Sequence, residues 1–468
     1  MSAPVIEALA GIVGARNVIT DADAMVPFLK EPRGLFHGKA QAVVRPGSVA
    51  EVSALMKWAS ETGVTVVPQG GNTGMVGGQV PVAEGKEIIL SLQRLDRVRS
   101  VDAAGDTMTV EAGVILQKAQ EAAEAAGRLF PLSLASEGSC TVGGNLSSNA
   151  GGTAVIAYGN ARELCLGLEV VLADGRVWNG LRQLRKDNTG YDLKNLFIGS
   201  EGTLGIITAA VLKLFPLPAA RATAFLAVPD PDAALALLNK AKASAGGTLT
   251  TFEIMPRIGL DFVVRHASGA RDPLSEPSPW YVLMEVCAQA ETGLADAVEA
   301  FLGEALEEGL VTDAVLAGSL GQRADLWKLR EMLSEVQTHE GGSIKHDVSV
   351  PLQATPEFLK RAIAKVEEMV PGCRPVPFGH LGDGNIHFNV SQPVGADKAA
   401  YLAGWGTMNE AVHAIVTELK GSISAEHGIG RLKRSLLPGV KDPVELDLMR
   451  TVKAALDPKG VLNPGSVL

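Results

Sequence analysis

The sequence predicts an α+β protein made of two domains and a C-terminal segment. With 468 residues, the chain exceeds the length that one hydrophobic core usually organises. Pro216 and Pro218 separate two patterns. Short strands divided by glycine-rich stretches precede them, and strands that alternate with amphipathic helices follow. We therefore expect domains at 1–218 and 219–421 and a segment at 422–468, with an antiparallel sheet in the second domain.

Hydrophobic periodicity places the elements of the first domain. Val52, Leu55 and Met56, followed by Ala59, have helical spacing, so 49–62 should be a helix. The short apolar run at 63–67 predicts a buried strand. The other elements expected here are helices at 5–13 and 114–126 and strands at 42–45, 88–92, 107–112, 166–172 and 176–178.

The second domain shows longer elements. We expect strands at 222–228 and 280–286 and helices at 232–245, 291–308 and 355–369. Residues 326–331 fit one face of a further helix.

Composition excludes several classes of protein. The formal net charge is −10 and no Lys/Arg run is present, so nucleic acid is not an expected partner. The four cysteines are widely spaced, which is typical of unpaired thiols in a reducing compartment. The sequence shows no secretion signal and no apolar stretch of the length that spans a bilayer. We therefore expect a soluble, cytoplasmic protein without a membrane span.

A glycine-rich loop directly follows the strand at 63–67. Its sequence is VPQGGNTGMVGG (67–78), with five glycines in twelve residues. Glycine permits positive φ and close approach of the backbone, so successive N–H groups can converge on a diphosphate. The pattern is neither a P-loop nor the dinucleotide fingerprint of a strand-to-helix turn. Taken alone, the loop fits a plain tight turn equally well.

Two further stretches have loop composition. Residues 131–152 are rich in Gly, Ser, Asn and Thr, and 186–208 carry a third glycine cluster. Long loops within compact domains are usually functional or disordered. The apolar residues that punctuate 131–152 favour an ordered, functional loop over a flexible surface excursion.

Two histidines flank a turn signal in FGHLGDGNIHFNV (378–390). If Asp383-Gly384 forms a two-residue turn, His380 and His387 stand opposite each other on one face of a hairpin. Opposite side chains are close enough for two imidazoles to share a metal ion. A structural histidine pair is the alternative.

The next candidates lie in SISAEHGIG (422–430). Glu426 would complete a two-histidine, one-carboxylate set suited to zinc or another first-row metal. His427 would then be a nearby base, which requires a loop or bulge because adjacent strand residues face opposite ways. A surface Glu-His pair is the alternative.

Two cations belong to the same domain. Arg330 lies in the expected helix at 326–331, where exposure is the default. Lys345 lies in a strand-like run that points it to the same face as Asp347. A buried lysine there needs an anion, either a substrate carboxylate or one of Asp347 and Glu426.

Together these motifs resemble the FAD-dependent D-2-hydroxy acid dehydrogenases of the vanillyl-alcohol-oxidase type, especially the D-2-hydroxyglutarate and D-lactate dehydrogenases. The resemblance covers nearly the whole chain, through the three glycine-rich stretches, GHLGDGNIH, SAEHGIG and DPKGVLNPGSVL (457–468). It implies a two-part FAD-binding domain, an α+β substrate domain, and a C-terminal segment that returns to the flavin and completes the active site.

The resemblance also implies roles for individual residues. FAD would be bound by residues of the three loops and the C-terminus: Pro68, Gln69, Gly70, Gly71, Asn72, Thr73, Gly74, Gly77, Gly78, Pro131, Ser136, Gly138, Ser139, Thr141, Gly143, Gly144, Asn149, Gly151, Glu201, Gly202, Ile207 and Asn463. His380, His387 and Glu426 match the metal ligands, with zinc as the first choice, and His427 matches the catalytic base. The substrate-binding positions are Arg330, Ser334, Lys345 and Asn389.

Three positions differ from relatives in this group. Asn72 occupies the position of a histidine that holds flavin covalently in some of them, so FAD should be bound non-covalently. Ser334 stands where threonine is frequent, and His346 where tyrosine is common. The last two differences bear on which substrate is preferred and not on the chemistry.

The expected activity is oxidation of D-2-hydroxyglutarate to 2-oxoglutarate, with metal-assisted substrate binding and hydride transfer to flavin N5. The alternatives are a D-lactate or glycolate dehydrogenase and a non-catalytic protein that binds flavin or another ligand. An electron-transfer flavoprotein or a quinone would accept the electrons, and the family suggests a homodimer.

Overall fold

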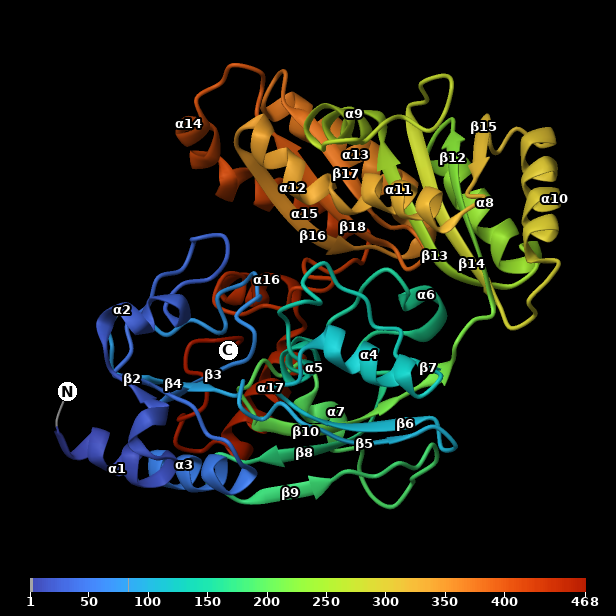
Figure 1. Cartoon of the computed structure of the whole chain (residues 1–468). Helices are drawn as coiled ribbons and strands as arrows, with labels where there is room; N and C mark the ends of the chain where they lie inside the picture. The colour runs from blue at the N-terminus through green and yellow to red at the C-terminus, as the bar shows by residue number, and fades with distance from the viewer. Residues whose placement is uncertain (1–2, 83) are drawn as a thin grey trace. The chain divides into compact units, whose positions relative to one another are not determined.

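The computed structural model describes residues 3–82 and 84–468 (Figure 1). The chain forms two compact units. Unit 1 contains the chain up to Gly151 together with Gly159–Leu217 and Glu426–Leu468. Unit 2 contains Gly152–Tyr158 and Pro218–Ala425. Both units are thus built from segments that are distant in the sequence.

Unit 1 begins with a small sheet whose strand order is β1-β2-β4-β3. Its inner pairs, β2 with β4 and β3 with β4, are parallel, and β1 is antiparallel to β2. The strands and helices of this part are α1 (Ala3–Val13), β1 (Val18–Ile19), α2 (Ala22–Met25), β2 (Ala42–Val44), α3 (Val49–Thr62), β3 (Val66–Gln69) and β4 (Ile88–Ser91).

The predicted helix at 49–62 is confirmed as α3. It begins after Ser48, whose side chain accepts a hydrogen bond from the Glu51 N–H, and it ends at Gly63 with φ 73°. The apolar residues with helical spacing are buried against α1 and the small sheet. This packing fixes the direction in which β3 enters the glycine-rich loop.

The second sheet of unit 1 is antiparallel, with strand order β5-β6-β10-β8-β9. Its strands are β5 (Val98–Asp102), β6 (Thr107–Glu111), β8 (Cys165–Val171), β9 (Val177–Gly180) and β10 (Ile206–Lys213). The connections contain α4 (Leu116–Ala125), α5 (Val142–Ser148) and α7 (Lys194–Phe197), and β7 (Arg128–Leu129) pairs with β11 (Phe215–Pro216).

The C-terminal segment adds main chain beside β3. Its helices are α16 (Leu437–Val440) and α17 (Pro443–Leu456). The Val66 N–H donates to the Val461 carbonyl at 2.8 Å, and the Asn463 N–H donates to the Val66 carbonyl at 2.8 Å. The strand that opens the glycine-rich loop is therefore held by the last residues of the chain.

Unit 2 is built on an antiparallel sheet of seven strands in the order β15-β12-β14-β13-β17-β18-β16. These strands are β12 (Ala220–Val228), β13 (Thr248–Pro256), β14 (Trp280–Ala288), β15 (Asp313–Leu316), β16 (Ser343–Ser349), β17 (Arg374–His380) and β18 (Asn385–Ser391). The antiparallel sheet predicted for this region is confirmed.

Helices contact both faces of this sheet (Figure 1). On one face, Phe225, Met255 and Phe378 pack in a core with residues of α9, α11 and α12. On the other, the ring of Phe388 lies 5.6 Å from Phe358 of α13. The helices of unit 2 are α6 (Val155–Tyr158), α8 (Pro231–Ser244), α9 (Arg257–His266), α10 (Leu294–Glu307), α11 (Leu320–Glu331), α12 (Leu333–Val336), α13 (Thr355–Met369), α14 (Lys398–Ala403) and α15 (Trp405–Glu418).

The β17–β18 hairpin corrects the predicted register. His380 pairs with Asn385 and Phe378 pairs with His387, so the connection is a loop of four residues rather than the two-residue turn Asp383-Gly384. Leu381 is fully buried in that loop, and the Gly384 N–H donates to the His380 carbonyl at 3.1 Å. Because the register shifts by two residues, His380 and His387 still share a face, as diagonal neighbours.

Candidate functional site

The first glycine-rich loop is tied down by its own polar side chains. Gln69 Nε2 donates to the carbonyls of Phe28 and Gln79, each at 3.0 Å. Asn72 has φ 57°, and its Nδ2 donates to the carbonyls of Pro27 and Lys30, each at 2.9 Å. These hydrogen bonds hold the predicted loop in place, and they occupy the Nδ2 of Asn72.

The first and second loops lie against each other without room for side chains between them. A Cβ atom on Gly70 would overlap the Thr141 hydroxyl, and one on Gly71 would overlap the Ser139 carbonyl. Thr141 begins α5 by accepting a hydrogen bond from the Gly144 N–H at 3.4 Å. Glycine is required at position 71 because main chain lies against main chain, and at position 70 because the capping hydroxyl of Thr141 fills the space.

Glu201 links the third loop to the C-terminal segment. Its carboxylate accepts hydrogen bonds from the N–H groups of Ile429 (2.7 Å) and Gly430 (2.8 Å), and its carbonyl accepts one from Asn463 Nδ2 (2.8 Å). Burial raises the pKa of Glu201 to about 7, although the two N–H donors oppose that rise. Like Asn72, the residues Asn149, Glu201 and Asn463 have positive φ.

These loops fit a nucleotide cofactor. Among the described residues, Gln69 Oε1, Asn72 Oδ1, Asn463 Oδ1 and Ser466 Oγ are buried without a hydrogen-bond partner. Such orphaned atoms in the first loop and the C-terminal segment suit the hydroxyl and N–H groups of a dinucleotide. Of the other predicted residues, Ile207 is buried in β10, and Gly202 lies against Pro68.

One face of the unit 2 sheet carries most of the predicted residues of the second domain. Paired residues of an antiparallel ladder point to the same face, so the register decides which side chains are neighbours. Seven polar residues that the register places on this face are Glu253, Lys345, Asp347, His380, Asn385, His387 and Asn389, and Glu285 of β14 is on the same face.

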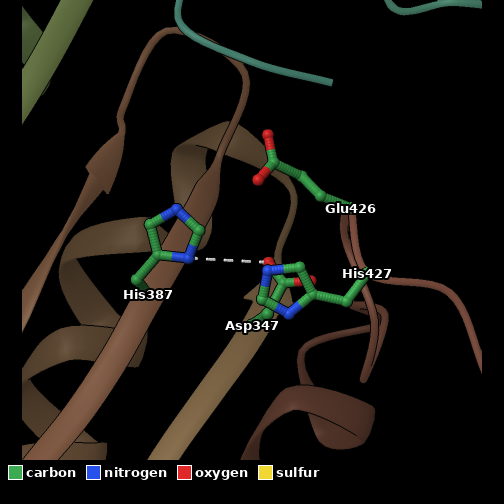
Figure 2. Close-up of side chains that lie close together, drawn as sticks. All are labelled: Asp347, His387, Glu426 and His427. Carbon is green, nitrogen blue, oxygen red and sulfur yellow. Dashed lines mark ion pairs between the residues drawn. The ribbon is translucent and has the colours of Figure 1, made fainter. Parts of the chain in front are cut away.

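The two histidines lie close together on that face. The ring centroids of His380 and His387 are 5.4 Å apart. His387 Nδ1 lies 3.8 Å from Asp347 Oδ1 (Figure 2). Asn385 Nδ2 donates to the same oxygen at 3.0 Å. Two imidazoles and a carboxylate on neighbouring strands are donors that fit a divalent first-row metal.

Asp347 was not among the predicted metal ligands. Sequence reasoning placed it on the same face as Lys345, and this is confirmed by the pairing of β16 with β18. That pairing sets Asp347 opposite His387, a neighbour that could not be predicted without the register.

A buried carboxylate holds both Arg330 and His380. Glu253 Oε2 accepts from Arg330 Nε at 2.6 Å, and its Oε1 lies 2.6 Å from His380 Nδ1. Burial favours the neutral acid, but the interactions with His380 and Arg330 outweigh it and lower the pKa of Glu253 to about 2. The expected exposure of Arg330 is wrong: it is 7% exposed, and its guanidinium lies 4.8 Å from the centre of the Phe378 ring.

The remaining predicted substrate-binding residues adjoin one another. Lys345 pairs with Asn389 across β16 and β18, and Lys345 Nζ is 3.5 Å from the Ser334 carbonyl of α12. A cation, an amide and a helix end therefore meet at this part of the sheet. The second cation, Arg330, comes from α11 on the same side.

Glu426 and His427 lie in irregular backbone, as predicted. Gly428 (φ 81°) and Gly430 (φ 50°) follow them and give the chain the freedom that a strand would deny. Within unit 1, a Cβ atom added to Gly151 would lie 2.9 Å from Glu426 Oε1. The predicted cofactor residue Gly151 and the predicted ligand Glu426 are thus neighbours.

All four cysteines are buried free thiols, which confirms the prediction of no disulfide bonds. Over the described ranges, no helix combines the length and the apolar character needed to cross a bilayer.

Comparisons with known proteins define the class first. Residues 40–180 match the family described as FAD binding domain, and residues 217–467 match the FAD linked oxidases, C-terminal domain. The solved structure of p-cresol methylhydroxylase with substrate bound has a TM-score of 0.76 at 16% identity and covers 99% of this chain and 96% of that one. The predicted fold of the vanillyl-alcohol-oxidase type is confirmed, and the chain is an FAD-dependent oxidoreductase.

Curated relatives define the family. The mitochondrial D-2-hydroxyglutarate dehydrogenase of Arabidopsis thaliana is 37% identical over 98% of this chain and 80% of its own length. That of Bos taurus is 40% identical over 98% and 82%, and the D-2-hydroxyglutarate dehydrogenase of Stutzerimonas stutzeri is 36% identical over 99% and 98%. The chain belongs to the D-2-hydroxyglutarate dehydrogenase family of FAD-linked oxidases.

Proposed function

We propose that the protein oxidises D-2-hydroxyglutarate to 2-oxoglutarate with bound FAD. The observation that carries this proposal is the polar face of the unit 2 sheet, where the cations Arg330 and Lys345 accompany His380 and His387. A five-carbon diacid has two carboxylates and needs a cation for each. The names of the family members agree with this substrate.

FAD would be held non-covalently by the three loops and Asn463. Bound FAD would supply the acceptor for the hydride from C2. Asn72 offers no nucleophile for attachment, and its Nδ2 donates to two carbonyls of unit 1. Backbone N–H groups at Gly70 to Gly74 would meet the diphosphate, since glycine leaves them unobstructed.

A divalent ion, with zinc as the first choice, would be held by His380, His387 and Glu426. The carboxylate of Asp347, beside His387, adds a fourth donor of suitable type. Such an ion would supply a Lewis acid for the substrate oxygens. His380 would use Nε2, because its Nδ1 is engaged with Glu253.

The protein side chains would divide the remaining work. His427 would take the proton of the C2 hydroxyl, for which imidazole is the side chain with a suitable ordinary pKa. Arg330 would hold one carboxylate through its two Nη groups, since the contact with Glu253 uses Nε. Lys345 would hold the other carboxylate, with Asn389 and Ser334 beside it.

Loss of that proton and of the hydride accounts for both hydrogens removed from the substrate. A soluble electron-transfer flavoprotein or a quinone would then reoxidise the flavin. We further propose a cytoplasmic location and a homodimer. The relatives from Arabidopsis thaliana and Bos taurus are named as mitochondrial, and that from Stutzerimonas stutzeri is not.

The purified yellow protein should lose its flavin absorbance when D-2-hydroxyglutarate is added without oxygen. The L-isomer should not bleach it, because C2 would present the wrong bond to the flavin. Steady-state kinetics with D-2-hydroxyglutarate, D-lactate and glycolate should give the highest kcat/KM for the first. A higher kcat/KM for D-lactate or glycolate would show that this smaller acid is the substrate. If none of the acids bleaches the flavin, the result would favour a non-catalytic binding protein.

Replacing Arg330 or Lys345 with alanine should show which of the two cations binds the distal carboxylate of the substrate. The cation that binds the distal carboxylate is worth about 10–150-fold in KM for D-2-hydroxyglutarate, from a charge-assisted hydrogen bond of roughly 1.5–3 kcal/mol. The same variant should change the KM for D-lactate much less. Kinetics of Arg330→Ala and Lys345→Ala on both acids measure this.

The matched control is Lys328→Ala, which removes a half-buried cation of the same helix as Arg330, one whose Nζ donates to the Ser268 carbonyl. Thermal melting should accompany each assay, because Arg330→Ala also removes a partner of the buried Glu253. Equal losses on both acids in both variants would place both cations at the shared carboxylate end and would contradict the preference for a diacid.

A further inference from the structure

Glu253 is the most completely buried ionised side chain of the unit 2 sheet face. It is 0% exposed, at the position of β13 that pairs with His380 of β17. A carboxylate without water is stable in a protein only where donors or charges surround it. Each of its oxygens has one such partner, Arg330 for Oε2 and His380 for Oε1.

Each contact leaves the partner's other nitrogens pointing elsewhere. A carboxylate that accepts from imidazole Nδ1 fixes the tautomer in which Nε2 carries the lone pair, and it also fixes the plane of the ring. Likewise, a carboxylate that accepts from guanidinium Nε sets the direction of the two Nη groups. Glu253 therefore aims a proposed metal ligand and a proposed substrate cation with one side chain.

We propose that Glu253 is a positioning residue that couples metal binding to recognition of a substrate carboxylate. This inference rests on the proposed function, and it adds a residue to it. Because one rigid carboxylate serves both groups, a displacement of Glu253 should move both. A single substitution at Glu253, which itself would bind neither the metal nor the substrate, would then disturb the metal site and the carboxylate site together.

Glu285 offers a matched control. It is also buried, on the neighbouring strand β14, and it also binds an arginine of α11: Arg323 donates to it at 2.7 and 3.1 Å. Its other hydrogen bonds come from Thr223, Trp327 and Arg221, none of which is a proposed ligand. Glu285→Gln thus removes a similar buried charge without touching the site.

The experiment compares Glu253→Gln and Glu285→Gln in the FAD-loaded protein after incubation with zinc. A glutamine at 253 keeps the shape but has one acceptor oxygen and no charge. One of the two partners therefore loses its acceptor, and the other loses the charge that strengthens its hydrogen bond. We expect the zinc affinity of Glu253→Gln to fall by about 10–100-fold. The KM for D-2-hydroxyglutarate should rise by about 10-fold or more, even when excess zinc restores the metal content. FAD content should stay at the wild-type level, and Glu285→Gln should keep wild-type zinc affinity and KM.

Wild-type zinc affinity together with wild-type KM in Glu253→Gln would overturn the proposal. It would also be overturned if Glu285→Gln lost zinc affinity and raised KM as much as Glu253→Gln, because that result would indicate a general loss of sheet stability. Glu253→Asp provides a second variant if Glu253→Gln fails to fold. Aspartate keeps the charge but is too short to reach both His380 and Arg330. One of the two quantities, zinc affinity or KM, should therefore change, while the other stays at the wild-type value. Wild-type protein that takes up no zinc also overturns the coupling. Zinc binding is measured without substrate and therefore does not depend on the proposed substrate. If that substrate is wrong, the wild-type protein will already show no turnover of D-2-hydroxyglutarate.

Discussion

Replacing His387 with alanine should remove the proposed divalent ion and reduce kcat by more than about 100-fold while FAD stays bound. Losing a residue that only supports a ligand commonly costs 10–100-fold, and a ligand itself should cost more. The Asp347 carboxylate, 3.8 Å from the His387 ring, would also lose its neighbour. FAD should remain because the predicted cofactor loops belong to unit 1 and His387 belongs to unit 2.

Metal analysis, flavin absorbance and turnover of the same sample measure these three quantities. His339→Ala is the control, since His339 lies in the short 3₁₀ turn Gln337–Glu340 and contacts His266 rather than a proposed ligand. An unchanged ion content in His387→Ala would refute the ligand assignment. Loss of FAD together with the metal would indicate a wider structural failure.

Replacing Gly71 with alanine should abolish FAD binding. The added Cβ would meet main-chain atoms of Ser139 and Cys140, which cannot rotate away as a side chain could. The first and second loops would have to separate, and the cradle that they form would open. The ratio of flavin to protein absorbance after purification should fall close to zero.

Gly439→Ala is the control in the same unit, because nothing lies within 4 Å of the position that its Cβ would take. Circular dichroism of Gly71→Ala should still show a folded protein, as the sheets of unit 1 do not contain Gly71. Full flavin content in Gly71→Ala would show that the contact between the loops does not form the cofactor site.

Local sequence signals predicted the elements whose causes are local. Ser48 caps the start of α3, Gly63 ends the helix, and four apolar residues at helical spacing form its buried face. The helix therefore has the predicted bounds. The glycine-rich loops were also found, because glycine marks positive φ and close backbone contact. Asn149, Glu201 and Asn463 adopt the same backbone region without such a mark, and their conformations could not be predicted.

The parts that could not be predicted depend on pairing between distant strands. Glu253 lies 77 residues before Arg330 and 127 before His380 in the sequence, so its local pattern does not reveal its partners. The strand β13 that carries it was not predicted either. The hairpin was found, but its register depends on the burial of Leu381 in the loop, which the Asp-Gly signal does not report.

The main-chain bonds that join Val66 to Val461 and Asn463 also bear on the order in which the chain can fold during synthesis. A ribosome releases Pro218–Ala425, most of unit 2, before residues 426–468 exist outside it. Unit 1 is started first, yet the support for β3 and for Glu201 arrives last. A nascent chain that stops before Val461 would therefore already carry every strand of unit 2, while β3 of unit 1 would still lack its main-chain partners Val461 and Asn463.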